Sequence, residues 1–354
     1  MFRRIFIMTN SELQNLFMFA DGTPVITVDD WQRRRIEMRD IIVGIEYGGM
    51  PPVPECTEYE ILHTASVAAL SETRFMSIRV ITDKSFSFIM TLLIPPGDGP
   101  FPVVLNGDGC WKYASDEVSA EIIRRGNIFA QFNRVEIAHD NYNSNRDSGI
   151  YSVYPEGNYG ALSAWAWGYH RCVDVLEKMS FADSSKIGIV GHSRGGKAAL
   201  LAGATDDRIA VTSPNNSGCG GAGSYKYQGP ESETITNIMQ AVPYWFNPDF
   251  KDYIGRENEL PFDQHFLKAL IAPRPLLTTE ALDDLWANPT GTWQTHTAAK
   301  EAYKFLNAPK QIGIFFRKGG HNHGIDDWCV FLDFMDWQLY GKVLTINFNN
   351  NPFL

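Results

Sequence analysis

The sequence predicts an α/β fold with a mostly parallel central sheet and helices on both faces. The first observation is alternation: from about residue 100 onwards, short apolar runs typical of strands are separated by longer segments typical of helices, and this order favours parallel strands. The second is size, because 354 residues with 44% hydrophobic content are ample for one large core. We therefore expect residues 1–60 to form an N-terminal extension packed on a single domain of residues 61–354.

The N-terminal part of the chain predicts one helix and one hairpin. An amphipathic segment at 31–40 indicates a helix, and the proline-rich stretch at 51–54 ends it. Two segments rich in β-branched and aromatic residues, 76–80 and 85–94, flank a short polar turn and indicate a β-hairpin.

The rest of the chain predicts strands and helices in turn, from the period and length of its apolar segments. The expected strands cover residues 101–105, 127–132, 186–190, 209–213, 275–279 and 312–317. The expected helices cover residues 115–125, 160–179, 196–203 and 325–340. A polar, aromatic and glycine-rich segment at 214–265 lies at the strand ends, and its length is more typical of a substrate loop or cap than of a second domain.

The most informative motif is Gly-His-Ser-Arg-Gly at 191–195, between an expected strand and an expected helix. In that context Gly-x-Ser-x-Gly is the nucleophile elbow of α/β-hydrolases. The turn is strained, and its two glycines avoid collisions with the neighbouring helix and strand. The strain lifts the Ser193 hydroxyl to the top of the sheet, where a histidine can reach it and the next amide can face an oxyanion. A helix-capping serine would explain Gly191 but not Gly195.

Charge and composition exclude several classes of partner. The formal net charge of -10 disfavours nucleic acid and anionic membranes, since both require a basic face. No run is long and apolar enough to span a bilayer. Residues 1–10 lack the pattern of a signal peptide, so we expect a cytoplasmic location. The five cysteines are widely spaced and form no CxxC pair, which indicates neither a disulfide framework nor a zinc site.

The chain also contains the other two members of a hydrolase triad, in the order serine, acid, histidine. Asp283 and Asp284 follow the next-to-last expected strand, and His321 and His323 follow the last one. The histidine would accept the serine proton, and the carboxylate would hold its tautomer and stabilise the imidazolium. On order and spacing alone, either histidine can be the base.

Two other motifs are given less weight. The histidines at 321 and 323, with Asp326 and Asp327 downstream, invite a metal site, but the aspartate is displaced from the metallo-hydrolase arrangement and no histidine follows it. The glycine-rich residues 218–223 lack the Gly-Lys-Ser/Thr ending of a phosphate loop. We expect a tight loop near the active site there, and neither a metal nor a cofactor in the protein.

Longer motifs resemble those of one family. In chain order they are GHSRGGK at 191–197, SGCGGA at 217–222, PYWF at 243–246, ENELPFDQH at 257–265, IAPRP at 271–275, DLWA at 284–287 and GH at 320–321. With them the chain resembles carbohydrate esterase family 15, the glucuronoyl esterases, in their bacterial type. The resemblance implies an α/β-hydrolase that cleaves esters of 4-O-methyl-glucuronic acid, such as those that join lignin alcohols to xylan.

The resemblance also implies roles for individual residues. Ser193 is similar to the family's nucleophile. His321 is similar to the family's base, because it precedes Asp327 and Trp328 by the spacing that the family histidine shows. Arg194 looks like the arginine that stabilises the oxyanion. Lys197, one helical turn past Ser193, matches a lysine that contacts sugar hydroxyls, and Trp286 matches a tryptophan beside the uronate.

A carboxylate of the long loop also binds sugar hydroxyls in the family. Glu233 fits when the chain is aligned backwards from the PYW motif, and Glu231 fits when it is counted forwards from Ser193. We favour Glu233 and keep Glu231 as the alternative.

One position departs from the pattern. Fungal members carry the triad glutamate after the strand that follows the elbow helix, where this chain has Asn216. An amide cannot replace the carboxylate without a large loss of rate. Some bacterial members place the acid after the later strand instead, and Asp284 occupies that position here, with Asp283 as the adjacent alternative.

Together these features predict a serine esterase that cleaves a small-molecule or oligosaccharide glucuronate ester through an acyl-enzyme. A sugar O-acetyl esterase would share the elbow and triad and differ only in its pocket. The third hypothesis is a weakly active, carbohydrate-binding relative of the hydrolases, suggested by Asn216 in place of an acid.

Overall fold

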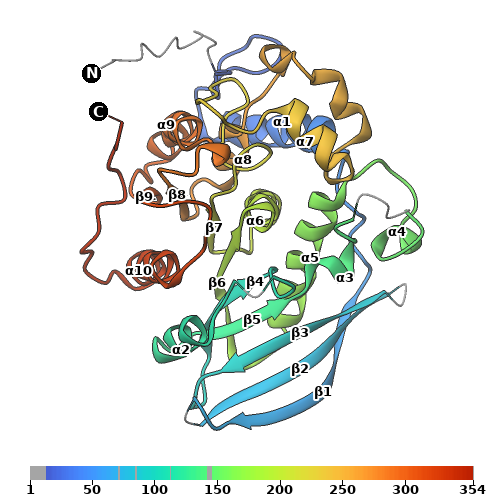
Figure 1. Ribbon diagram of the computed structural model, residues 1–354, viewed down its shortest axis with the longest axis vertical. Coiled ribbons are helices and arrows are strands. Elements are labelled where there is room, and N and C mark those ends of the chain that lie inside the picture. Colours follow the sequence, from blue (N-terminus) through green and yellow to red (C-terminus); the bar gives the residue numbers. More distant parts are fainter. Residues whose placement is uncertain (1–12, 71, 84–85, 112, 142–145, 354) are drawn as a thin grey trace.

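The computed structural model describes residues 13–70, 72–83, 86–111, 113–141 and 146–353. Its centre is a nine-stranded sheet in the order β1-β2-β3-β5-β4-β6-β7-β8-β9 (Figure 1). The strands are β1 (Thr57–Val67), β2 (Thr73–Thr82), β3 (Ser87–Ile94), β4 (Phe101–Asn106), β5 (Ile128–Phe132), β6 (Ala182–His192), β7 (Val211–Asn215), β8 (Leu276–Ala281) and β9 (Ile312–Arg317).

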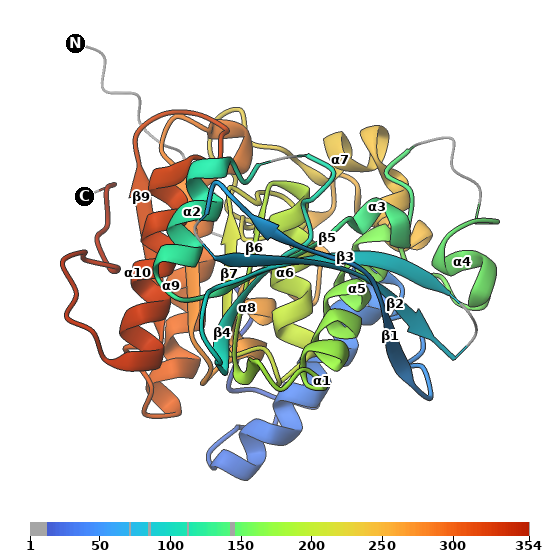
Figure 2. The ribbon, with the colours of Figure 1, turned by 90° about the horizontal axis from the view of Figure 1, so that it is seen from below.

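The sheet is mostly parallel, as the sequence predicts. The strands from β5 through β4, β6, β7 and β8 to β9 pair in parallel, whereas β1, β2 and β3 pair antiparallel and join β5 antiparallel. Figure 2 shows the antiparallel strands at one edge of the twisted sheet.

Helices cover both faces of the sheet. They are α1 (Val28–Tyr47), α2 (Asp116–Arg124), α3 (Arg134–Ile137), α4 (Ile150–Val153), α5 (Ala161–Leu176), α6 (Arg194–Thr205), α7 (Ile235–Ala241), α8 (His265–Ile271), α9 (Pro289–Phe305) and α10 (Ile325–Tyr340). Successive strand residues point to opposite faces, so Val103 and Leu105 join the larger core with α1, α5, α6, α8 and α9, while Val104 joins the smaller core with α2 and α10.

The N-terminal segment is more deeply built into the fold than expected. Helix α1 begins after a capping box at Thr27 and Asp30 and ends at Gly48, whose φ of 73° is left-handed, so it extends past both expected ends. Its Trp31 side chain is fully buried. Residue 60, where we expect the extension to end, lies inside β1, which pairs with β2 in the main sheet.

Other expected elements differ mainly in length. Strands β4 and β6 extend beyond their predicted ends, and the helix expected at 160–179 ends at Leu176. The strand at 312–317 and the helix at 325–340 are found as predicted. Helices α8 and α9 were not expected. Residues 1–10 and the hairpin positions 84–85 lie outside the described residues.

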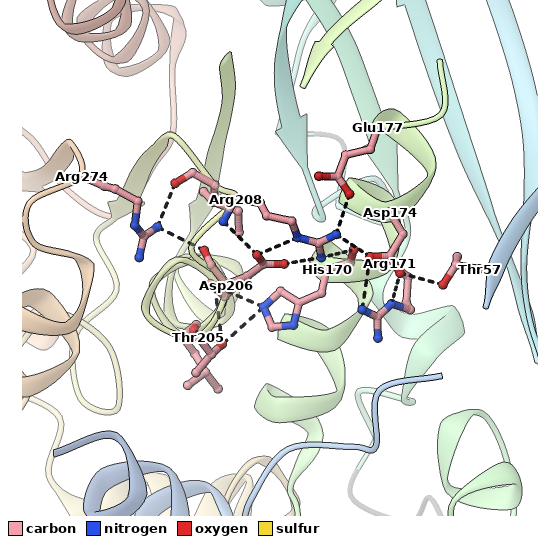
Figure 3. Close-up of polar contacts among 12 residues, drawn as sticks. Thr57, His170, Arg171, Asp174, Glu177, Thr205, Asp206, Arg208 and Arg274 are labelled. Carbon is pink, nitrogen blue, oxygen red and sulfur yellow. Dashed lines mark hydrogen bonds and ion pairs between the residues drawn. The ribbon is translucent and has the colours of Figure 1, made fainter. Parts of the chain in front are cut away.

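An ionic network ties the far end of α6 to α5 and β1 (Figure 3). Arg208 contacts Asp206 at 2.7 Å and Asp174 at 2.8 Å. Asp174 also accepts from Arg171 at 2.6 Å and from the Thr57 hydroxyl at 2.7 Å. Because Ser193 precedes the first residue of α6, these contacts help to hold the helix that follows the Gly-x-Ser-x-Gly turn.

Candidate active site

The serine turn has the strained geometry that its sequence predicts. Ser193 lies between β6 and α6 with φ 55° and ψ -122°, outside the usual regions for a residue with a side chain. A Cβ at Gly191 would lie 2.2 Å from the Gly195 carbonyl oxygen, and one at Gly195 would lie 1.9 Å from Asp108 Oδ1. Both glycines are therefore required by close approach, and the side chain that excludes a Cβ at Gly195 is Asp108.

Asp108 supports the turn from the end of β4. Its Oδ2 accepts from the backbone N–H of His192 at 2.9 Å, and its Oδ1 contacts the Arg134 guanidinium. Burial raises the pKa of Asp108, and the charge of Arg134 acts in the opposite direction. This buried pair fixes the residue next to Ser193.

Ser193, His321 and Asp284 form a continuous hydrogen-bonded row. His321 Nε2 lies 2.9 Å from Ser193 Oγ, and His321 Nδ1 lies 2.6 Å from Asp284 Oδ2. With Nδ1–H donating to the carboxylate, Nε2 accepts from the serine hydroxyl. The row can therefore carry the serine proton to a histidine whose cationic form faces a carboxylate.

Asp284, and not Asp283, is the carboxylate that reaches His321. Asp284 Oδ2 also accepts from Asn216 Nδ2 at 2.8 Å, and burial opposes the lowering of its pKa by the bonds from His321 and Asn216. Asp283 Oδ2 instead accepts from the backbone N–H of Gly319 at 2.8 Å. Asp283 thus anchors the loop that carries the histidine.

His323 does not contact the serine. Its ring stacks on Trp328 at 4.7 Å and on His192 at 5.5 Å between ring centroids. Burial holds the pKa of His323 well below its usual range, with the neighbouring His192 adding to the effect. Of the two histidines, the one within hydrogen-bond distance of the Ser193 hydroxyl is therefore His321.

Arg194 lies against two indoles and one carboxylate. Its guanidinium carbon is 5.2 Å from the Trp111 ring centroid and 5.0 Å from that of Trp245. Its Nη1 donates to Asp140 Oδ2 at 2.8 Å. The arginine is next to the nucleophile in sequence and is held beside it in space, where a fixed positive charge can meet an oxyanion.

Lys197 is buried one turn along α6, where the loop after β7 encloses it. Its Nζ donates to the carbonyl oxygen of Ser217 at 2.7 Å and also to that of Cys219. Glu233 Oε2 lies 3.4 Å from the same nitrogen. The glycine-rich loop thus presents carbonyl oxygens to a cation, which agrees with a tight loop at the site and not with a phosphate loop.

The two candidate glutamates have different surroundings. Glu233 faces Lys197, and its backbone N–H donates to the Trp286 carbonyl at 3.0 Å. Glu231 is exposed and has a left-handed φ of 64°. Trp286 has 51% of its surface exposed. The structure therefore groups Glu233 with Lys197 and the Trp286 backbone.

The end of α1 supports the loop that holds Lys197. The Tyr47 hydroxyl donates to the Gly220 carbonyl at 3.2 Å. The fully buried Glu46 carboxylate accepts from the Tyr225 hydroxyl at 2.8 Å and from Gln264 Nε2 at 2.9 Å. Burial raises the pKa of Glu46 to about 7, despite these hydrogen bonds.

Several of these supporting residues were not predicted. Asp108, Trp111 and Asp140 come from the loops after β4 and α3, and no local motif marks them. Trp245 belongs to the PYW motif, but the sequence does not reveal that it packs on Arg194.

In the described part of the chain, no group of three or more His, Cys, Asp or Glu side chains is arranged to hold a metal. Nor does that part contain a helix with the length and apolarity needed to cross a bilayer.

A strained serine at a strand–helix turn, hydrogen-bonded to a histidine and an aspartate from later strand ends, defines a serine hydrolase of the α/β-hydrolase fold. The description of the matching family is "Glucuronyl esterase, fungi", and its model covers residues 78–307. The chain belongs to this glucuronyl esterase family.

Relatives and solved structures agree with this membership. A 4-O-methyl-glucuronoyl methylesterase of Schizophyllum commune is 32% identical over 98% of this chain and 87% of its own. A family 15 glucuronoyl esterase from Caldicellulosiruptor kristjansonii has a TM-score of 0.86 at 32% identity, over 99% of this chain and 96% of that one. A mutant of the Sporotrichum thermophile enzyme, in complex with methyl 4-O-methyl-beta-D-glucopyranuronate, has a TM-score of 0.80 at 29% identity, over 94% and 89%. The expected restriction to a bacterial type is not supported, since the matching family is described as fungal.

Proposed function

We propose that this protein hydrolyses esters of glucuronic acid, or of its 4-O-methyl ether, through an acyl-enzyme on Ser193. The observation that carries the proposal is the row from Ser193 through His321 to Asp284. Arg194 is next to the serine, and Lys197, four residues after the serine, contacts Glu233 of the long loop. The names of the relatives and the glucuronate bound to a homologue support this acyl group.

In the first step, His321 Nε2 takes the hydroxyl proton of Ser193 while Oγ attacks the C6 carbonyl carbon of the ester. The carbonyl π electrons move to oxygen and give a tetrahedral oxyanion. When the intermediate collapses, the bond to the alcohol oxygen breaks, and His321 donates its proton to the leaving alcohol. Water, deprotonated by the same nitrogen, then releases the uronic acid and restores the Ser193 hydroxyl.

Arg194 and the first N–H groups of α6 are the donors for the oxyanion. The first turn of a helix has N–H groups without intrahelical partners, and Arg194 adds a full positive charge held at the same place. Such fixed donors stabilise the charge that develops in the transition state, and losing one costs roughly 10²–10³ in kcat.

Lys197, Glu233 and Trp286 form the proposed sugar-binding side. The contact between Lys197 and Glu233 places a donor and an acceptor together, as the hydroxyl groups of a sugar require. The exposed Trp286 offers an apolar face beside them. Glu231 is exposed, and the proposal assigns it no sugar contact.

The test compares two esters with the wild-type protein. We expect a kcat/KM for benzyl glucuronate well above that for 4-nitrophenyl acetate. A preference for the acetate would move the assignment to a sugar O-acetyl esterase, which would use the same row of residues. The binding-only alternative depended on a missing acid at Asn216, and the contact of Asp284 with His321 removes that premise.

A further inference from the structure

Asp140 is a nearly buried carboxylate in contact with the Arg194 guanidinium. Its side chain, from the segment after α3, is only 3% exposed. Oδ2 accepts from Arg194 Nη1 at 2.8 Å. Oδ1 accepts from the Tyr244 hydroxyl at 2.9 Å and from Trp245 Nε1 at 3.0 Å. Both carboxylate oxygens therefore have donors, and three separate parts of the chain meet at this group.

Three contacts restrict the orientation of the Arg194 guanidinium. The indoles of Trp111 and Trp245 lie against it, and Asp140 holds one of its five N–H donors. The Trp245 indole contributes twice, because its ring packs on the arginine while its N–H binds the same Asp140. An arginine side chain that is 36% exposed would otherwise sample many rotamers.

We propose that Asp140 is a positioning residue that fixes Arg194 for oxyanion stabilisation. The inference rests on the proposed function, since it takes Arg194 as an oxyanion donor. A donor accelerates acyl transfer only if it already points at the developing charge, so that no reorganisation is needed during the reaction. Asp140 supplies this preorganisation without contacting the ester, and its own charge is spread over two neutral donors as well as the arginine.

A purely structural role for Asp140 would give different results. Asp140 also joins the Tyr244–Trp245 turn to the segment after α3, so its loss could act on packing alone. Packing would affect activity whether or not Arg194 is present. A positioning role acts only through Arg194 and must vanish when that side chain is removed.

The experiment is a double-mutant cycle with Asp140→Asn, Arg194→Ala and the double variant, in which kcat and KM are measured separately. We expect Asp140→Asn to lower kcat about tenfold with KM nearly unchanged, a part of the roughly 10²–10³ that a lost oxyanion donor costs. In the Arg194→Ala background the same change should lower kcat less than about twofold. An equal loss in both backgrounds, or no loss in either, would overturn the proposal.

Two esters keep this test separate from that of the substrate. Benzyl glucuronate and 4-nitrophenyl acetate give the same kind of oxyanion, so the coupling between Asp140 and Arg194 is expected with whichever ester is hydrolysed. If the protein hydrolysed the acetate but not the glucuronate, the proposed substrate would be contradicted. If Asp140 and Arg194 showed no coupling with either ester, only the role of Asp140 would be contradicted.

A second variant covers the case that Asp140→Asn does not fold. Tyr244→Phe removes one donor to Oδ1 and leaves both the carboxylate and Arg194 in place. We expect a loss in kcat of about two- to fivefold that also disappears in the Arg194→Ala background; a loss that persists there would contradict the proposal. Asp252→Asn, at an exposed carboxylate, is the matched control for loss of negative charge and should change neither kcat nor KM.

Discussion

Asn216 and His321 donate to the same oxygen of Asp284. Asn216 Nδ2 lies 2.8 Å from Asp284 Oδ2, and His321 Nδ1 lies 2.6 Å from it. Asn216 stands at the end of β7 with a left-handed φ of 43°, whereas Asp284 follows β8. The amide at the position where the family resemblance places a glutamate thus supports the aspartate that follows the neighbouring strand.

The first prediction separates the two adjacent aspartates. Asp284→Asn should lower kcat by about 10³–10⁴, because an amide no longer holds the histidine tautomer or stabilises the imidazolium. Asp283→Asn is the matched control and should lower kcat by less than about tenfold, since it weakens only the hydrogen bond from the Gly319 N–H. Steady-state kinetics on one ester measure both. Equal losses at the two positions would be inconsistent with the assignment of the acid.

The second prediction concerns a carboxylate in place of Asn216. Asn216→Asp would put two carboxylates in contact, and like charges at that distance raise the pKa of one of them. A pKa raised above its unfolded value means that stability is present at low pH and is lost as pH rises through the folded pKa.

Denaturant unfolding at several pH values measures this effect. The variant should be less stable than the wild type near pH 7, and the difference should shrink as the pH is lowered towards 4. A difference that is constant with pH would show that the amide does not donate to Asp284 as described.

The third prediction distinguishes the two glutamates of the long loop. Glu233→Gln should raise KM for benzyl glucuronate by about tenfold, since a charged acceptor for sugar hydroxyls is lost. KM for 4-nitrophenyl acetate, which has no sugar, should stay the same. Glu231→Gln is the matched control at an exposed position. A larger KM effect at Glu231 would reverse the choice.

The fourth prediction concerns the buried Glu46. Its folded pKa is raised by burial to about 7, above the ordinary value of 4.5, so its contribution to stability is present below pH 4.5 and is lost as the pH rises through about 7. Glu46→Gln keeps a similar shape without the titration. The stability of the wild type relative to the variant should therefore fall as the pH rises from 4.5 through about 7, and the variant should have gained relative to the wild type by pH 9.

Thermal unfolding at pH 5.5 and pH 9 compares the two proteins. A difference in Tm that does not move with pH would mean that Glu46 does not titrate in this range. Activity of the folded variant is expected to stay close to that of the wild type, because Glu46 acts on the loop through other side chains, among them Tyr225 and Gln264.

Much of the fold could be predicted because parallel strands buried on both faces have continuous apolar sequences. The run before Ser193 is an example. Strand β1 was not predicted, because most of its residues are exposed and the alternation of polar and apolar residues extends only from Glu58 to Ile61. It exists because its backbone pairs along β2, and that pairing is not encoded in a local period.

The site could be predicted as far as local motifs define it. The elbow around Ser193 and the order of acid and histidine are local features of the chain. The choice of Asp284 over Asp283 and of His321 over His323 required the positions of loops from different strands. Asp140 is 54 residues from Arg194 in the chain, so their contact could not be inferred from spacing.

The most direct test of the proposed mechanism is the hydrolysis of benzyl glucuronate by the wild type and by Ser193→Ala. The substitution removes only the hydroxyl, so the variant should fold with an unchanged Tm while kcat falls by about 10⁴ or more. That result would establish Ser193 as the nucleophile that forms the acyl-enzyme with the glucuronoyl group. Turnover retained by a correctly folded Ser193→Ala protein would contradict the nucleophile, and with it the proposed mechanism.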